Sequence, residues 1–235
     1  MNIFHIDDLI IYRSIFKYIN SNMYIFSEGE SALVVDPHET NELLDLLRKT
    51  QNITIILTHE HADHISGVFW LQQHFSCKII CTKSCANYIA NEKCVRPILI
   101  SFILEEQDRI NGTNILGEFK RKVVPHTYKA DITFEDSYIE QWGGHRLDFF
   151  KVLGHSPGSC GIIVDNKLAF MGDSLMKSLP VITRFPGGNK KIYINETLPF
   201  LEKKIKPDMM IMPGHGDPFL LNDIMEGGKI NVGFR

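Results

Sequence analysis

Four residues that can bind a metal ion lie close together in the sequence: His59, His61, Asp63 and His64. Three imidazoles and a carboxylate packed this closely lose solvation unless a cation shares them, and Zn²⁺ readily takes such nitrogen and oxygen ligands. They directly follow the apolar run at residues 53–57, which is typical of a buried strand. The cluster is therefore expected on a loop at the carboxyl end of a strand, where open α/β sheets bind their ligands.

Three later segments each place one histidine or aspartate after an apolar run and beside a glycine. They are Gly154-His155, Gly172-Asp173 and Gly214-His215. Glycine permits the sharp turns and close backbone approach that such positions require. We therefore expect four strand ends to bring their side chains to one edge of the sheet.

The seven side chains suffice for a two-metal site. In this hypothesis one zinc ion is held by His59, His61 and His155, a second by Asp63, His64 and His215, and Asp173 bridges the two. Metal ions about 3.5–4 Å apart can share a water, lower its pKa towards neutrality and polarise a carbonyl or phosphoryl oxygen. That is hydrolytic chemistry without a protein nucleophile.

The order His-x-His-x-Asp-His, Gly-His, Gly-Asp, Gly-His resembles the metallo-β-lactamase-fold superfamily, and most of all its glyoxalase II-like hydrolases. The resemblance extends over nearly the whole chain. It implies an α/β fold, the αββα four-layer sandwich, in which two mixed sheets pack face to face with helices outside. It also implies that the seven residues are metal ligands, and that Asp63 orients the attacking hydroxide and shuttles its proton. Asp36, at the end of an early strand, matches a superfamily position that is usually structural.

The apolar pattern favours a single domain over residues 1–235. Strands are expected at 9–12, 23–26, 32–35, 53–57, 78–81, 146–152, 160–164, 168–171 and 209–212. Helices are expected near 39–49, 65–74, 84–91 and 190–205. Residues 95–143 are less regular, and we interpret them as an insertion that could form a lid or wall over the site.

Composition narrows the partners and the compartment. A net charge of -3 and only short basic runs give no electrostatic case for binding nucleic acid. No apolar stretch approaches the length of a membrane span, and the first residues lack the basic region of a signal peptide. The five cysteines are odd in number and are interpreted as free thiols. We expect a cytoplasmic protein with a small-molecule substrate and no membrane partner, and the sequence leaves its oligomeric state open.

We therefore predict an enzyme, a metal-dependent hydrolase of a small-molecule thioester, ester or lactone. It would use two divalent ions, Zn²⁺ by preference, with Fe or Mn as alternatives. True glyoxalase II continues after the last histidine into a helical domain that holds glutathione, whereas only residues 216–235 follow here. Glutathione thioesters are therefore not the favoured substrate. Acyl-homoserine lactonases have a similar length and share the motif, so a lactonase stays open.

Two other classes of function also stay open. One is a mononuclear iron dioxygenase acting on persulfides, which resembles this motif set but holds its metal with two histidines and an aspartate. The other is a non-catalytic or biosynthetic partner protein, for instance one that acts as a thioesterase on a carrier-bound acyl group. Further candidates for contact with substrate are Lys177, Arg184 and Asn189 after Asp173, and His126 and Tyr128 in the insertion.

Overall fold

Strands with apolar residues on both faces form the centre of the fold. In β4 (Ser31–Val35), Leu33 and Val35 pack between the two sheets, while Ala32 and Val34 pack on the opposite face. Successive side chains of a strand point to opposite faces, so a continuous apolar run belongs in a strand that is covered on both sides. The computed structural model describes residues 1–233. In it, a second sheet packs on one face of the sheet that contains β4, and helices pack on the other face.

The first sheet has seven strands in sequential order. They are β1 (Asn2–Ile6), β2 (Leu9–Ile15), β3 (Asn22–Glu28), β4, β5 (Asn52–Ile56), β6 (Ser76–Thr82) and β7 (Ile132–Phe134). The strands from β1 to β4 pair antiparallel, and those from β4 to β7 pair parallel. The sheet is therefore mixed, and its parallel strands end at the same edge.

The second sheet has six strands in the order β13-β12-β11-β10-β9-β8. They are β8 (Ser137–Trp142), β9 (His145–Lys151), β10 (Cys160–Val164), β11 (Leu168–Gly172), β12 (Met210–Pro213) and β13 (Phe219–Leu220). Only β11 and β12 pair parallel. A separate hairpin is formed by β14 (Met225–Glu226) and β15 (Lys229–Ile230).

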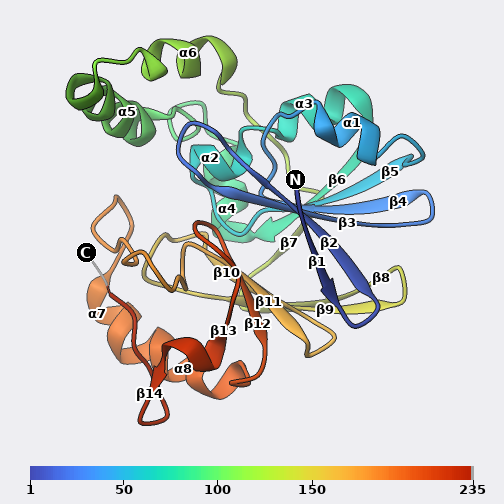
Figure 1. Cartoon of the computed structure of the whole chain (residues 1–235), viewed down its shortest axis with the longest axis vertical. Coiled ribbons are helices and arrows are strands. Elements are labelled where there is room, and N and C mark those ends of the chain that lie inside the picture. Colours follow the sequence, from blue (N-terminus) through green and yellow to red (C-terminus); the bar gives the residue numbers. More distant parts are fainter. Residues whose placement is uncertain (234–235) are drawn as a thin grey trace.

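Helices cover the outer face of each sheet (Figure 1). Those beside the first sheet are α1 (Glu42–Leu46), α2 (Ala62–Ile65), α3 (Val68–His74) and α4 (Lys83–Ile89). Those beside the second sheet are α7 (Lys190–Ile192), a π-helical turn (Tyr193–Thr197) and α8 (Leu198–Lys204), with a 3₁₀ turn at Leu221–Ile224. The π-helical turn lies just before Pro199, which has no N–H for the helical ladder. The architecture is the αββα sandwich that the sequence predicted.

The segment at residues 95–143, interpreted from its less regular sequence as an insertion, has regular secondary structure over most of its length. It contains α5 (Ile98–Asn111), α6 (Ile115–Lys122), β7 and β8. Because β7 and β8 are strands of the two sheets, only the helical part lies outside the sandwich, and α5 and α6 extend beyond one end of it in Figure 1. The Phe119 ring of α6 contacts the rings of Phe16 and Tyr18 from the turn after β2.

All five cysteines are free thiols. Among residues 1–233, no helix is long and apolar enough to cross a membrane.

Candidate metal centre

The structure brings all seven predicted site residues together at one end of the sandwich. His59, His61, Asp63 and His64 follow β5, while His155, Asp173 and His215 follow β9, β11 and β12 respectively. Their ligand atoms form groups in which every atom lies within 4.8 Å of the others: His59, His61, His155 and Asp173 in one, and Asp63, His64 and His215 in another. Four strand ends thus meet at one point, as the sequence predicted.

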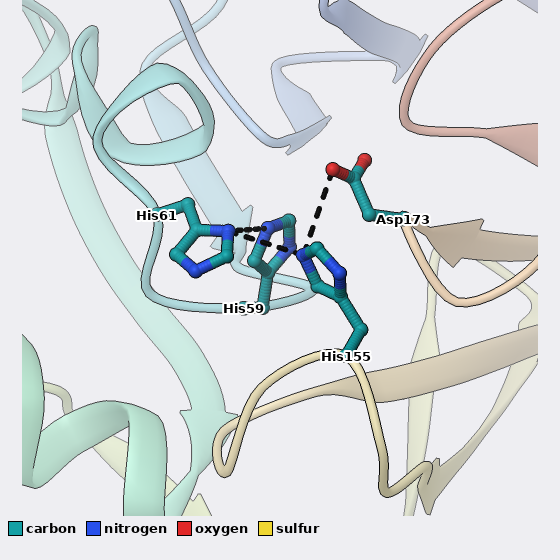
Figure 2. Close-up of side chains that lie close together, drawn as sticks. All are labelled: His59, His61, His155 and Asp173. Atoms are coloured by element: carbon teal, nitrogen blue, oxygen red, sulfur yellow. Dashed lines mark hydrogen bonds and ion pairs between the residues drawn. The ribbon is translucent and has the colours of Figure 1, made fainter. Parts of the chain in front are cut away.

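Three imidazoles point towards one another in the first group (Figure 2). Nε2 of His59 lies 3.0 Å, and Nε2 of His155 lies 3.1 Å, from Nδ1 of His61. On the far side of each outer ring, Nδ1 of His155 lies 2.7 Å from the carbonyl oxygen of Ile182, and Nδ1 of His59 lies 3.0 Å from the hydroxyl of Thr58. A carbonyl oxygen only accepts hydrogen bonds, so His155 carries its proton on Nδ1.

The hydrogen bonds of this group cannot all be satisfied by the protein. The Thr58 hydroxyl donates to the Asp36 carboxylate at 2.6 Å, so it must accept from Nδ1 of His59. Each outer ring, when neutral, therefore presents a bare Nε2 lone pair to His61. One nitrogen of His61 carries at most one proton and can donate to only one of the two. A cation that accepts lone pairs from all three rings fits this arrangement.

The second group combines two imidazoles with two carboxylates. Nε2 of His64 lies 3.3 Å from Oδ2 of Asp63 and 3.4 Å from Oδ1 of Asp173. Nε2 of His215 lies 3.3 Å from the same Asp63 oxygen and 3.6 Å from Oδ2 of Asp173. Within residues 1–233, Nε2 of His64 and Oδ1 of Asp173 are buried without a hydrogen-bond partner. Buried polar atoms are rarely left in that state, so these two atoms fit a metal ligand set as well.

Asp173 lies between the two groups. Its Oδ2 is 3.6 Å from Nε2 of His155 in the first group, as well as close to His215 in the second. The carboxylate has two oxygens and several lone pairs, so it can face both groups at once. This is the position that a bridging ligand requires.

The two groups differ in their affinity for protons. Burial lowers the pKa of all three imidazoles in the first group, that of His61 to about 3. Burial also disfavours the charged form of His64 and His215, but Asp63 and Asp173 outweigh it and raise the pKa of both rings. The first group thus offers neutral nitrogen ligands, and the second strongly attracts positive charge.

Asp36 and Thr58 fix the orientation of two of the imidazoles. The buried carboxylate of Asp36 accepts from the Thr58 backbone N–H at 2.7 Å, from the Thr58 hydroxyl, and from Nδ1 of His64 at 2.9 Å. Because Thr58 in turn contacts Nδ1 of His59, one carboxylate sets the tautomer of both rings. Carboxylates that hold metal-binding histidines in this way tune their basicity and position. The family resemblance matched Asp36 to a position that is usually structural, and these contacts are consistent with that role.

The loop that carries His215 is held by residues that the sequence reasoning missed. The Asn22 amide donates to the carbonyls of Pro213 and Gly216, and the Tyr24 hydroxyl donates to Pro213 at 2.9 Å. The Arg13 guanidinium donates to Gly216 at 3.1 Å. All three side chains come from β2 and β3 of the other sheet, so no local motif could reveal them. Arg13 and Asn22 adjoin apolar runs and Tyr24 lies within one, so the sequence gives only a weak signal for them.

One glycine is required by a close approach at the centre. Gly172 adopts a φ of +48°, and a Cβ there would lie 2.8 Å from Cβ of Thr58 and even closer to its hydroxyl. A larger residue would push Thr58 away from Asp36 and His59. The glycine before Asp173 thus serves the packing of the site as well as the turn.

A cavity of about 590 Å³ opens onto the metal-binding residues. Its floor includes His61, Asp63, Asp173 and His215. One wall comes from residues 93–103, which include the start of α5, and another from residues 176–186. The cavity falls within the volume range of small-molecule sites, so a substrate can reach the centre from this side.

The predicted substrate-contacting residues divide into two sets. Arg184 lines the cavity. Lys177 instead pairs with Asp223 at 3.0 Å, and the Asn189 side chain caps α7. Two residues of the predicted insertion also lie elsewhere, because the His126 ring stacks on Phe69 and Tyr128 is buried beneath the helices of the first sheet. Proximity in sequence to Asp173 therefore identified one of three candidates, and the insertion contributes to the cavity through residues 96–103 instead.

The fold agrees with a comparison against known families. The model of the metallo-beta-lactamase superfamily matches residues 18–215, and the chain belongs to that superfamily. The resemblance stated from the motif order is thereby confirmed.

Individual relatives are more distant. The chain is 27% identical to hydroxyacylglutathione hydrolase GloC of Haemophilus influenzae, over 82% of this chain and 83% of that protein. It is 24% identical to the probable metallo-hydrolase YqgX of Bacillus subtilis, over 84% of this chain and 86% of the relative. The chain therefore has homologues among the glyoxalase II-like hydrolases, as the motif order suggested.

Solved structures share the fold. The B3 metallo-beta-lactamase BLEG-1 superposes with a TM-score of 0.68 at 21% identity, covering 91% of this chain and 95% of the other. A di-iron-bound form of TTHA1623 gives a TM-score of 0.64 at 20% identity, covering 90% and 95%. ETHE1 from Myxococcus xanthus gives 0.61 at 15% identity, covering 88% and 76%. At these identities the likeness shows the fold alone.

Proposed function

We propose that the chain is a hydrolase of a small-molecule thioester, ester or lactone that depends on two divalent metal ions. The observation that carries the proposal is the pair of bare Nε2 lone pairs facing His61, together with the buried, unpartnered Nε2 of His64 and Oδ1 of Asp173 within residues 1–233. These atoms lie at the floor of a cavity that admits a small molecule. The relatives that are named as hydrolases support the same class of reaction.

The ligand sets follow the two groups of side chains. The first ion would be held by His59, His61 and His155, the second by Asp63, His64 and His215, and Asp173 would contact both. Bound there, such ions supply polarisation of the substrate carbonyl and a water of lowered pKa. Imidazole and carboxylate ligands suit Zn²⁺, and they also suit Fe and Mn. The fold neighbour TTHA1623 was solved in a di-iron-bound form, which keeps iron among the choices.

Asp63 carries the proposed proton-handling role. Its Oδ2 faces His64 and His215, which hold the pKa of the carboxyl well below its usual range although burial alone would raise it. Asp63 also lines the cavity. An ionised carboxylate at this place can orient a water for attack and take its proton.

The test replaces Asp63 by asparagine. Asp63→Asn keeps the size of the side chain and removes its basicity, so we expect turnover to fall by about 10²–10⁴-fold, the usual contribution of acid–base catalysis. The control is Asp208→Asn, an exposed carboxylate that does not line the cavity, which should leave turnover unchanged. Elemental analysis accompanies the hydrolysis assay on the same preparation. Full activity in Asp63→Asn would contradict the role of this residue.

The same preparation distinguishes the dioxygenase alternative. Two metal ions per chain with release of acid and thiol, alcohol or hydroxyacid supports the hydrolase. One iron per chain, with oxygen consumed and sulfite formed from a persulfide, would replace the proposal by the mononuclear dioxygenase.

A further inference from the structure

Charged residues around the cavity are distributed unequally. The acidic residues of its lining are Glu60, Asp63 and Asp173, which are low in exposure and belong to the floor. The remaining charged residues, apart from the histidines, are Lys93, Arg96 and Arg184, and all three are exposed. The outer part of the cavity is therefore cationic, although the chain as a whole carries a net charge of -3.

The charged groups of these three cations are unpaired in the part of the chain that the structure describes. Among those residues, no ion pair or hydrogen bond involves the ammonium of Lys93 or the guanidinium of Arg96 or Arg184. Exposed lysines elsewhere in residues 1–233 are of both kinds, paired as Lys83 is with Glu135 or unpaired as Lys120 is, so these three cations differ from the others by their place in the lining of the cavity. The three cations come from the segments on the two sides of the cavity. Gly187, three residues after Arg184, lies beside α4, which ends four residues before Lys93: a Cβ on Gly187 would lie 3.6 Å from the hydroxyl of Tyr88 in α4. Unpaired cations around a cavity raise the local concentration of anionic ligands.

Most of the remaining lining of the cavity is apolar. Their large side chains include Ile98, Ile100 and Ile103 of α5, and Met176, Leu179 and Ile182 opposite them. Two of the six are substantially exposed to solvent, Ile98 by 52% and Leu179 by 46%. Contiguous exposed apolar side chains around a concave site mark a place where an apolar ligand group is buried.

We infer that the substrate is a thioester of an extended hydrocarbon acyl group with an anionic thiol. This inference rests on the proposed hydrolase and names its substrate class. The thioester carbonyl lies at the metal centre, the acyl chain lies between α5 and residues 176–182, and the anionic group of the thiol contacts the three cations. In the reaction, the oxygen of water bonds to the acyl carbon and the C–S bond breaks, which gives a carboxylic acid and the thiol. A short, polar hydroxyacyl group would leave the apolar walls in contact with water.

Binding of unreactive thioethers tests this inference without turnover. The probes are S-octyl-coenzyme A, S-ethyl-coenzyme A, S-octyl-glutathione and the neutral S-octyl-N-acetylcysteamine, titrated calorimetrically into the metal-loaded full chain. We expect the octyl thioether of coenzyme A to bind at least about tenfold more tightly than the ethyl one, because each buried methylene adds affinity. We expect it to bind at least about tenfold more tightly than the neutral octyl thioether. The glutathione probe tells whether carboxylates serve as the anion as well as phosphates.

Variants assign each preference to its residues. Arg96→Gln combined with Arg184→Gln should remove most of the preference for the anionic probe and leave the neutral one unchanged. Ile98→Ser should reduce the preference for octyl over ethyl. Their matched controls are Lys120→Gln, an exposed cation of α6, and Ile110→Ser, an exposed isoleucine of α5, neither of which lines the cavity.

The outcomes separate the two proposals. Equal affinity for octyl and ethyl probes, or for anionic and neutral probes, overturns the substrate class even if a hydrolysis assay succeeds with another ester. Selective binding of the anionic octyl probe by a fully metallated protein that hydrolyses no thioester supports the binding site and contradicts the hydrolase.

Discussion

Thr58 provides the sharpest test of how the centre is positioned. Its hydroxyl donates to Asp36 at 2.6 Å and accepts from Nδ1 of His59 at 3.0 Å, in a side chain that is 1% exposed. Thr58→Val keeps nearly the same shape and removes both contacts. The lost hydrogen bond to a carboxylate amounts to about 1.5–3 kcal/mol, and the unpaired N–H of His59 adds about 1–3 kcal/mol. We therefore expect the metal-free variant to lose about 2.5–6 kcal/mol of unfolding free energy.

Metal binding should weaken as well, because Nδ1 of His59 no longer has an acceptor that fixes its tautomer. Loss of such an outer partner typically costs about 10–100-fold in metal affinity. The stability is measured by urea unfolding with a chelator present, and the affinity by competition with a chromophoric chelator. Thr58→Ser, which keeps the hydroxyl, is the control. Equal metal affinity in Thr58→Val and Thr58→Ser would refute the proposed orientation of His59.

Three further predictions follow from the same contacts and from one buried histidine. Gly172→Ala places a methyl group against Thr58 at a φ of +48°. We therefore expect a loss of about 2 kcal/mol in unfolding free energy and weaker metal binding. If the turn relaxes to make room for the methyl group, neither effect will be seen. Tyr24→Phe removes the hydrogen bond to the Pro213 carbonyl and should cost about 1 kcal/mol of unfolding free energy, measured by urea unfolding. Unchanged stability would show that the hydrogen bonds from Asn22 and Arg13 are sufficient to hold the loop. Burial lowers the pKa of His38 below its usual 6.5, so its neutral form contributes stability that is complete above pH 6.5 and is lost as the pH falls further. The difference in unfolding free energy between the wild type and His38→Gln should therefore narrow on acidification, and a constant difference would contradict this.

The local pattern of the sequence was sufficient to predict which side chains meet at the centre. Residues 53–57 are typical of a buried strand, and the histidines after them had to lie at its carboxyl end. The same reasoning applied to His155, Asp173 and His215, because each follows an apolar strand at a turn with glycine. Strand ends are local features, so they can be recognised without knowing which strands are neighbours.

Residues 95–143 show where local reasoning was insufficient. The strand β7 has only three residues, and β8 alternates half-buried and exposed positions, so neither gives a strong apolar signal. Their place in the two sheets depends on pairing with β6 and β9. The helix α5 was also missed, since its apolar face covers the cavity rather than a sheet.

The sequence by itself determined which side chains meet at the centre, because their chemistry and their positions after strands are local properties. Only the tertiary structure decided what holds them and what surrounds them. Asn22 and Tyr24 reach Pro213 across about 190 positions of the chain. Arg96 and Arg184 line one cavity although they come from different halves of the sandwich. Contacts of this kind arise from the packing of two sheets against each other, and spacing along the chain carries no record of them.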